Sequence, residues 1–377
     1  MLPNKLCAEY IWLDANQVPR SKSRIIDTDC INSSGRCVSF TNENKQHTLP
    51  YVKSLPSWNY DGSSTGQAIG EHSEVLIKPV YVCRDPFRRN DTFHTKIFHS
   101  PEFKTCPPVL VLCETFDRDG NPLPSNTRFE VSPDKCNLHQ SSSRFGFEQE
   151  FFIMRGDDLA YNRTAEDTQG EFYCSSGVKK ANTRYVAEVA YMNCLIAGLR
   201  VTGMNAEVAP AQWEIQVSDV GLAACDQLIL LRYILNRTAE SHGFWINYHP
   251  KPKCIRDGDW NGSGCHANFS TLSTMRDGGF QKILNIIDVL KRNHQRDMQN
   301  YGADNEMRMT GLHETSSFYD FTYGVGNRGT SIRIPVETAE KNYGYFEDRR
   351  PASNCDPYLV ARSLLSAAKE VWDAENA

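Results

Sequence analysis

The spacing of apolar residues divides the chain into two regions. Up to about residue 120, short runs of alternating polarity, such as A-E-Y-I-W-L-D at 8–14, predict strands joined by turns. The continuous apolar run V-L-V-L-C-E at 109–114 predicts a buried strand. The stretch S-W-N-Y-D-G-S-S-T-G at 57–66 predicts a turn-rich loop, and D-R-D-G-N-P-L-P-S-N at 117–126, with its prolines and glycine, predicts a linker.

Beyond this linker, segments of helical periodicity alternate with short strand-like runs. Helices are predicted at 181–200, at 219–242 between a capping Asp219 and Gly243, at 279–301, and from Asp356-Pro357 to the end of the chain. Strands are predicted at 205–217, 244–249, 264–270 and 331–336. The pattern predicts an α+β protein, with a small, mostly β domain at 1–120 and a larger domain at 121–377.

Composition and charge narrow the class of protein. The 377 residues, 40% hydrophobic and 23% charged, are typical of a soluble globular protein of two domains. A net charge of −5 with both signs scattered argues against nucleic-acid or membrane binding. The start of the chain has no apolar leader, and no run reaches the roughly 20 apolar residues of a membrane span. The 13 cysteines include no C-x-x-C pair, so we expect reduced thiols in the cytoplasm rather than a zinc cluster or a disulfide framework.

Two acids stand inside an apolar run, R-F-G-F-E-Q-E-F-F-I-M-R at 144–155. In a strand, Glu148 and Glu150 project from the same face. Left without a partner on a half-buried face, one of the two would stay protonated. A bound divalent cation removes the conflict, provided that other segments supply its remaining ligands.

Further ligands occur in comparable apolar settings. They are Glu207 and Glu214 in N-A-E-V-A-P-A-Q-W-E-I-Q-V, His266 in G-S-G-C-H-A-N-F-S, and Glu347 in G-Y-F-E-D-R-R-P. Singly, each glutamate is more often a solvated strand end, and the histidine is more often a hydrogen-bonded core residue. Together, five carboxylates and one imidazole suit Mg²⁺ or Mn²⁺, in a number that satisfies two ions.

Arginines form a second set. Arg328 and Arg333 flank a Gly-Thr-Ser turn, where guanidinium and backbone N–H groups are able to bind phosphate oxygens. The other arginines of the set are Arg308 in R-M-T-G-L-H-E, and Arg349 and Arg350 in E-D-R-R-P. Any one of them is also explained by surface ion pairing. Acids that hold metals and arginines that hold phosphates are typical of a phosphoryl-transfer site. The G-x-G-x-x-G match at 324–329 is followed by S-I-R-I-P-V and not by a helix, so we exclude a dinucleotide site there.

The chain resembles glutamine synthetases of the eukaryotic type. The resemblance rests on W-N-Y-D-G-S-S-T, R-D-P-F-R-R, F-G-F-E-Q-E, N-A-E-V-A-P-A-Q-W-E, W-N-G-S-G-C-H-A-N-F-S-T, R-M-T-G-L-H-E-T-S, N-R-G-T-S-I-R-I-P and G-Y-F-E-D-R-R-P-A-S-N-C-D-P, which occur in the family's order. It implies an N-terminal β-grasp domain, a catalytic domain built on a curved antiparallel sheet, and a homo-oligomer of two stacked pentameric rings with active sites between subunits. The implied reaction uses ATP to phosphorylate L-glutamate, after which ammonia displaces the phosphate to give glutamine.

The resemblance also implies roles for single residues. Glu148, His266 and Glu347 match the ligands of the metal that bridges the ATP phosphates, and Glu150, Glu207 and Glu214 match those of the metal that orients the glutamate γ-carboxylate. The matches for the substrates are Arg308, Arg349, Asn261 and Gly262 for glutamate; Arg328, Arg333, Asn268, Ser270 and Tyr345 for ATP; and Asp61, Ser64 and Tyr173 for ammonium. Glu314 matches the flap that closes over the intermediate.

The chain departs from the family pattern in a few places, none of them a matched site residue. The helix that usually precedes the first β-grasp strand is expected to be missing, and 91–106 looks like an insertion. Two other readings are left open. A γ-glutamyl ligase for a larger amine would keep the metal ligands but lose the ammonium site, and a structural relative without activity would lose the metal ligands first.

Overall fold

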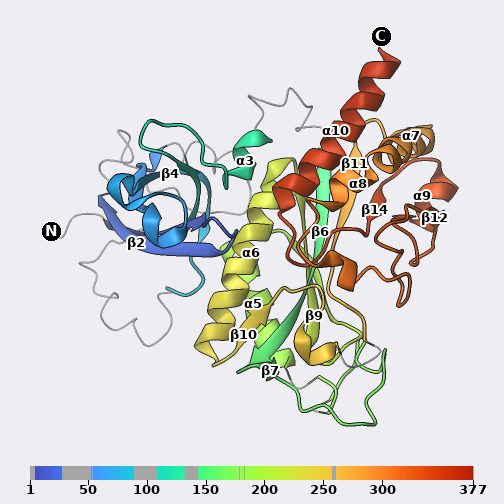
Figure 1. Ribbon diagram of the computed structural model, residues 1–377, viewed down its shortest axis with the longest axis horizontal. Helices are drawn as coiled ribbons and strands as arrows, with labels where there is room; N and C mark the ends of the chain where they lie inside the picture. Colours follow the sequence, from blue (N-terminus) through green and yellow to red (C-terminus); the bar gives the residue numbers. More distant parts are fainter. Residues whose placement is uncertain are drawn as a thin grey trace. The chain divides into compact units, whose positions relative to one another are not determined.

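The computed structural model describes residues 5–27, 52, 54–88, 108–131, 143–177, 179–181, 183–256 and 260–376. The predicted insertion at 91–106 lies outside these residues. The chain forms two compact units, one of Met1–Glu130 with Asn193–Leu199, the other of Val131–Met192 with Arg200–Ala377. Each unit is built on its own sheet (Figure 1).

The first unit contains a five-stranded mixed sheet in the order β2-β1-β5-β4-β3. Its strands are β1 Lys5–Leu13, β2 Pro19–Asp27, β3 Trp58–Asp61, β4 Glu74–Arg84 and β5 Val109–Phe116. Strands β1 and β5 pair in parallel, and the other pairs are antiparallel. This confirms the strands predicted at 8–14 and 109–114. The short helices of this unit are η2 Gly62–Thr65, η3 Gly70–His72 and α3 Thr127–Glu130.

The prediction of a loop at 57–66 is wrong in its first half, which forms β3. Tyr60 of that strand is 8% exposed and stacks on Trp12 with ring centroids 4.3 Å apart. Burying two aromatic rings stabilises the strand despite the neighbouring turn residues. The packing of Tyr60 anchors the end of β3, where Asp61 passes the chain into η2.

The second unit contains a nine-stranded sheet around β6, the long strand Ser143–Arg155. The other strands are β7 Asp158–Leu159, β8 Val201–Ala206, β9 Gln212–Val220, β10 Trp245–Asn247, β11 Cys265–Thr271, β12 Tyr323–Val325, β13 Ile332–Ile334 and β14 Phe346–Asp348. The main path runs β12-β13-β14-β11-β6-β9-β8. The sheet is curled and antiparallel as expected, except that β12 and β13 pair in parallel.

Helices flank this sheet (Figure 1). They are α5 Arg184–Ala197, α6 Leu222–Ser241, α7 Gly279–Arg292, α8 His294–Met298, α9 Val336–Lys341 and α10 Pro357–Glu375, with 3₁₀ turns η5 Lys253–Ile255 and η6 Asn305–Met307. Helix α6 packs on β6 and β9, and α10 packs on α6 and α7. The predicted start of the last helix is confirmed, because the Asp356 carboxylate accepts a hydrogen bond of 2.8 Å from the backbone N–H of Tyr358.

Three predicted boundaries need correction. Asp219 does not cap α6 but belongs to β9, where its carboxylate accepts hydrogen bonds from Arg200 and Gln227, at 2.8 and 2.6 Å. The helix predicted at 279–301 is broken at Asn293, between α7 and α8. The strand predicted at 205–217 is two strands, β8 and β9, because Pro210 and the left-handed Ala211 (φ 57°) turn the chain between them.

The two faces of β6 carry different side chains. Phe145, Phe147, Gln149 and Phe151 are fully buried on one face, toward the helices. Because side chains alternate along a strand, Glu148 and Glu150 project from the opposite face. The centre of the sheet thus presents a pair of carboxylates on an apolar support.

Candidate active site

The register of the sheet gathers the predicted metal ligands around β6. Glu148 lies directly opposite His266 of β11, and Glu150 lies directly opposite Glu214 of β9. Glu347 of β14 follows one strand further along, paired with Asn268 of β11. Directly opposed residues have Cβ atoms about 5 Å apart. Four strands, β6, β9, β11 and β14, therefore bring side chains from positions 148–347 into one cluster.

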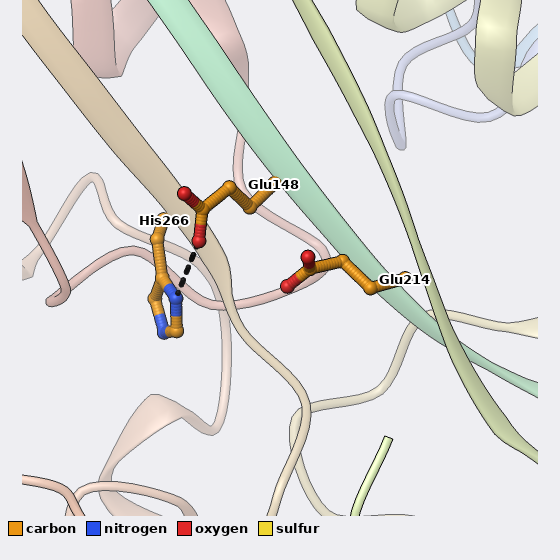
Figure 2. A group of neighbouring side chains, drawn as sticks. All are labelled: Glu148, Glu214 and His266. Carbon is orange, nitrogen blue, oxygen red and sulfur yellow. Dashed lines mark ion pairs between the residues drawn. The ribbon is translucent and has the colours of Figure 1, made fainter. Parts of the chain in front are cut away.

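The ligand atoms of this cluster lie close together. His266 Nδ1 is 3.5 Å from Oε2 of Glu148 and 3.5 Å from Oε1 of Glu347. The ligand atoms form two sets, Glu148–Glu214–His266 and Glu150–Glu207–Glu214, each with all its atoms within 4.8 Å of one another. Figure 2 shows the first set, with both carboxylates directed toward the imidazole. Glu214 belongs to both sets, so it lies between two candidate ion positions.

Burial and mutual repulsion shift the pKa values of these groups. Burial, together with the neighbouring glutamates, raises the pKa of Glu150 to about 8 and that of Glu214 to about 9. Burial also raises the pKa of Glu207 to about 7. Burial lowers the pKa of His266 well below its usual value, so its imidazole is neutral and has a lone pair to offer. Clustered carboxylates and a neutral imidazole fit hard divalent cations such as Mg²⁺ or Mn²⁺.

Amide side chains orient the acids, and most of them were not among the predicted site residues. Gln212 Nε2 donates to Oε2 of Glu150 at 3.1 Å and to the Gly262 carbonyl at 3.0 Å. Gln216 Nε2 donates to Oε1 of Glu214 at 2.6 Å. Both lie two residues from Glu214 on β9, so the period-two rule applied to this strand would have found them. Asn268 Nδ2 donates to Oε1 of Glu148 at 2.8 Å.

Two predicted arginines bind one predicted metal ligand. Arg333 Nη1 lies 2.9 Å from Oε2 of Glu347, and Arg349 Nη1 lies 2.6 Å from Oε1 of the same carboxylate. The Glu347 carboxylate, 2% exposed, is thereby neutralised on both oxygens. The resemblance implies that Arg333 binds ATP and that Arg349 binds glutamate; in this structure both guanidinium groups bind the Glu347 carboxylate.

Glu314 contacts two of the predicted arginines, Arg328 and Arg349. Its carboxylate is 3.6 Å from Arg328 Nη1, and its backbone carbonyl accepts a hydrogen bond of 3.3 Å from Arg349. Arg328 is also a hydrogen-bond partner of Tyr173. The backbone of His313 and Glu314 is left-handed, with φ of 54° and 59°. Neither is glycine, and such conformations cost on the order of 1–3 kcal/mol each, a kind of strain found at functional loops.

The residues matched to glutamate border the acid cluster. Arg308 is 5% exposed and uses Nε and Nη2 to hold Asn305 and the carbonyls of 349–351, which leaves Nη1 toward Gly264. A Cβ on Gly262 would lie 2.4 Å from the Pro250 carbonyl oxygen, so only glycine fits there. Asn261 is held by Gln169 through a pair of hydrogen bonds of 2.5 and 3.1 Å, and Gln169 is a further residue that sequence reasoning missed.

The residues matched to the nucleotide line a cavity beside Glu148. It has a volume of about 300 Å³, and Asn268, Ser270 and Tyr345 are among its lining residues. Arg144, Gln216 and Met275 line it as well. The cavity adjoins the acid cluster through Glu148, so a ligand in it would reach the candidate ion positions.

The residues matched to ammonium come from both units. In the first unit, the Asp61 carboxylate accepts hydrogen bonds from Ser63 Oγ at 2.6 Å and Ser64 Oγ at 2.9 Å. These bonds, those from Ser63 first, lower the pKa of Asp61, so it is ionised at neutral pH. Tyr173 belongs to the second unit.

Comparison with known proteins decides the family. Residues 134–281 match the family model described as "Glutamine synthetase, catalytic domain". The chain is 42% identical to the glutamine synthetase of Eremothecium gossypii over 358 residues, which cover 94% of this chain and 86% of that protein. It is 41% identical to the glutamine synthetase of Saccharomyces cerevisiae over 94% of this chain and 87% of that one. The chain belongs to the glutamine synthetase family.

Further similarities agree with membership of the glutamine synthetase family. A "Putative glutamine synthetase" of Acanthamoeba polyphaga mimivirus is 40% identical over 96% of this chain and 94% of that protein. A solved structure, "Apo GmaS without ligand", shares the fold with a TM-score of 0.68 at 17% identity, over 98% of this chain and 78% of that one. Glutamine synthetases use ATP and a divalent metal, and the acidic groups around β6 are able to hold such an ion. No helix in the described part of the chain is long and apolar enough to cross a membrane.

The raised pKa values predict an unusual pH dependence of stability. Glutamates of the unfolded chain titrate near pH 4.5, whereas Glu207, Glu150 and Glu214 of the folded chain titrate at about 7, 8 and 9. Their stabilising protonation is complete below about pH 4.5 and is lost as the pH rises through 7 to 9, with each pKa unit corresponding to about 1.4 kcal/mol. We expect the unfolding temperature of the metal-free protein to fall between about pH 4.5 and 9, and Mg²⁺ or Mn²⁺ to reverse the fall.

Differential scanning fluorimetry in chelator and in excess metal measures both curves. Glu214→Gln, which removes the most strongly shifted acid, is expected to flatten the curve of the metal-free protein. A metal-free protein whose stability rises over the same pH range would contradict the assignment of these pKa shifts.

Proposed function

We propose that this protein is a glutamate–ammonia ligase, which joins ammonia to the γ-carboxylate of L-glutamate at the expense of ATP. The reaction passes through a γ-glutamyl phosphate and gives L-glutamine, ADP and phosphate. The observation that carries the proposal is the cluster of buried acids and a neutral imidazole, in a chain about 40% identical to glutamine synthetases over most of its length. It is a ligase of glutamine biosynthesis.

The acid cluster supports a site for two Mg²⁺ or Mn²⁺ ions. Glu148, His266 and Glu347 would hold one ion and Glu150, Glu207 and Glu214 the other, and Glu214 is also near enough to contribute to the first set. Bound there, divalent ions would neutralise charge on the transferred phosphoryl group and on the carboxylate that attacks it.

The arginines would position and neutralise the two anionic substrates. Arg328 and Arg333 would bind the ATP phosphates, with Asn268, Ser270 and Tyr345 around the nucleotide in the cavity beside Glu148. Arg308 and Arg349 would hold the glutamate carboxylates, with Asn261 and Gly262 at its amino end. The bonds of Arg333 and Arg349 to Glu347 support this arrangement, because one carboxylate orients both guanidinium groups.

By resemblance to the family, in which a neighbouring subunit's N-terminal domain donates one wall of the active site, Asp61 and Ser64 of one subunit would bind ammonium together with Tyr173 of its neighbour. Ammonium has no lone pair with which to attack, so a nearby base must accept a proton first. The ionised Asp61 is suited to bind the cation and to take that proton, and Ser64 Oγ holds its carboxylate in place. By resemblance to the family, the protein would be a cytoplasmic homo-oligomer of stacked pentameric rings, with active sites between subunits.

Glu314 would belong to a flap that closes over the acyl phosphate and keeps water out. Support comes from its strained backbone and from its contacts with Arg328 and Arg349, one arginine from each substrate set. A flap that touches both sets is able to respond when both substrates are bound.

The ligase is tested by measuring phosphate release from ATP and Mg²⁺ while omitting glutamate or ammonium in turn. We expect full turnover, with glutamine as product, only when both are present. Glutamate-dependent turnover with a larger amine but not with ammonium would favour the γ-glutamyl-amine ligase. No turnover by a folded, metal-binding protein would favour the structural relative.

Removal of the Asp61 carboxylate is expected to impair the use of ammonium selectively. Asp61→Ala should lower kcat/KM for ammonium by about 100-fold or more, since general-base groups contribute typically 10²–10⁴. The binding of ATP and glutamate, followed by equilibrium titration, should change little. Asp27→Ala, which removes a surface acid paired with Lys5 in the same unit, is the matched control. Equal losses in ammonium use and in glutamate binding would refute the assigned role.

Removal of the Glu314 carboxylate is expected to uncouple the reaction. Glu314→Ala should increase severalfold the fraction of ATP that is hydrolysed without forming glutamine, because water gains access to the acyl phosphate. The ratio of phosphate to glutamine measures this directly. Glu306→Ala, an exposed acid in the preceding turn, should leave the ratio at its wild-type value. An unchanged ratio in Glu314→Ala would count against the flap.

A further inference from the structure

The residue between the two acids of β6 has a distinct environment. Gln149 projects from the opposite face to Glu148 and Glu150 and is fully buried. Its Nε2 donates to the carbonyl oxygen and the Oγ of Ser353, at 3.0 and 2.9 Å. Its Oε1 accepts a hydrogen bond of 2.7 Å from Nε of Arg232. The amide thus connects β6 to helix α6 and to the segment before α10.

Arg232 of α6 joins these segments through its guanidinium group. Its guanidinium donates to Gln149 through Nε, to the Cys355 carbonyl through Nη1 at 2.8 Å, and to the Ser353 carbonyl through Nη2 at 3.0 Å. Nη2 also lies 4.0 Å from Sγ of Cys355. None of these partners is a carboxylate, and within the described part of the chain no carboxylate forms an ion pair with Arg232. Partial burial of a cation without a counter-ion costs free energy, so an ordinary ion pair does not explain this arginine.

Ser353 extends the network to the main chain of the candidate metal site. Its Oγ donates to the Glu150 carbonyl at 2.6 Å, and its backbone N–H donates to the Ser263 carbonyl at 3.0 Å. Ser263 precedes Gly264, whose N–H binds the Glu150 carboxylate at 2.8 Å, and leads into β11 with His266. The segment that carries Ser353 follows directly from β14 with Glu347. The network therefore lies where the three ligand-bearing strands are joined.

We propose that Arg232, acting through Gln149 and Ser353, is a positioning residue that fixes the strands of Glu150, His266 and Glu347 in the geometry that a divalent cation requires. The proposal rests on the proposed function, because it takes these side chains to be metal ligands. The fork of an arginine suits the task, since it donates at once to three acceptors from two chain segments. A residue that only held the fold together would affect stability and leave metal affinity unchanged.

The test compares Arg232→Met and Ser353→Ala with Arg237→Met. Arg237 lies on the same helix, outside this network, and contacts Tyr233 and Glu240 instead. Two quantities are measured on the full-length protein, namely the Mn²⁺ concentration that gives half-maximal turnover and the Mn²⁺ concentration that gives half of the metal-induced rise in unfolding temperature without substrates. Partners behind metal ligands typically affect affinity by about 10–100-fold.

We expect Arg232→Met and Ser353→Ala to raise both Mn²⁺ concentrations about tenfold, with kcat at saturating metal within about threefold of wild type. Arg232→Lys should recover part of the affinity, because it keeps the charge but loses the fork. Arg237→Met should match the wild type. A lower unfolding temperature with unchanged Mn²⁺ dependence in these variants would overturn the proposal.

The measurements distinguish a failure of this proposal from a failure of the proposed function. Ser353→Ala removes a single hydroxyl group, so its Mn²⁺ dependence tests the proposal if Arg232→Met does not fold. Wild-type protein that binds Mn²⁺ but makes no glutamine would refute the ligase alone, and the unfolding curves would still test Arg232. Wild-type protein that shows no metal-induced stabilisation would refute the metal site and the role of Arg232 together.

Discussion

The concentration of carboxylates at the centre of one sheet is the constraint on which the rest of this structure depends. Glu150, Glu214 and Glu347 are at most 8% exposed and lie around an imidazole with 7% exposure. Like charges brought together out of water repel and are poorly solvated, so the fold is less stable for holding them ionised. Such a cluster persists only where the surrounding structure fixes it, and its groups are able to hold a divalent cation.

The neighbouring polar groups are arranged to meet that constraint. Two arginines cover the oxygens of Glu347, and amides of Asn268, Gln212 and Gln216 hold one oxygen each of three other acids. On the far side of β6, Gln149, Arg232 and Ser353 join the strands through their main chains. The first group orients side chains and the second orients the backbone that carries them, so the two act on the same geometry from opposite faces of the sheet.

Local pattern predicted much of the fold and the chemical composition of the site. Strong apolar runs placed β1, β5 and the long helices, and the Asp356-Pro357 pair placed the start of α10, because these signals depend on neighbouring residues only. Predictions failed where tertiary packing prevailed. Burial of Tyr60 stabilises β3 where a loop was predicted. The carboxylate of Asp219 accepts hydrogen bonds from Arg200 and Gln227 instead of capping α6.

The sequence by itself determined the α+β class, the identity of the acids, histidine and arginines, and the motifs that relate the chain to glutamine synthetases. Only the tertiary structure decided which of these groups meet. The pairing of Glu148 with His266 and of Glu150 with Glu214 follows from strand register, and Gln149 meets Ser353 across 204 positions of the chain. Such partners are chosen by the packing of distant segments, whose energetics involve the whole sheet and its helices, and no local spacing encodes them.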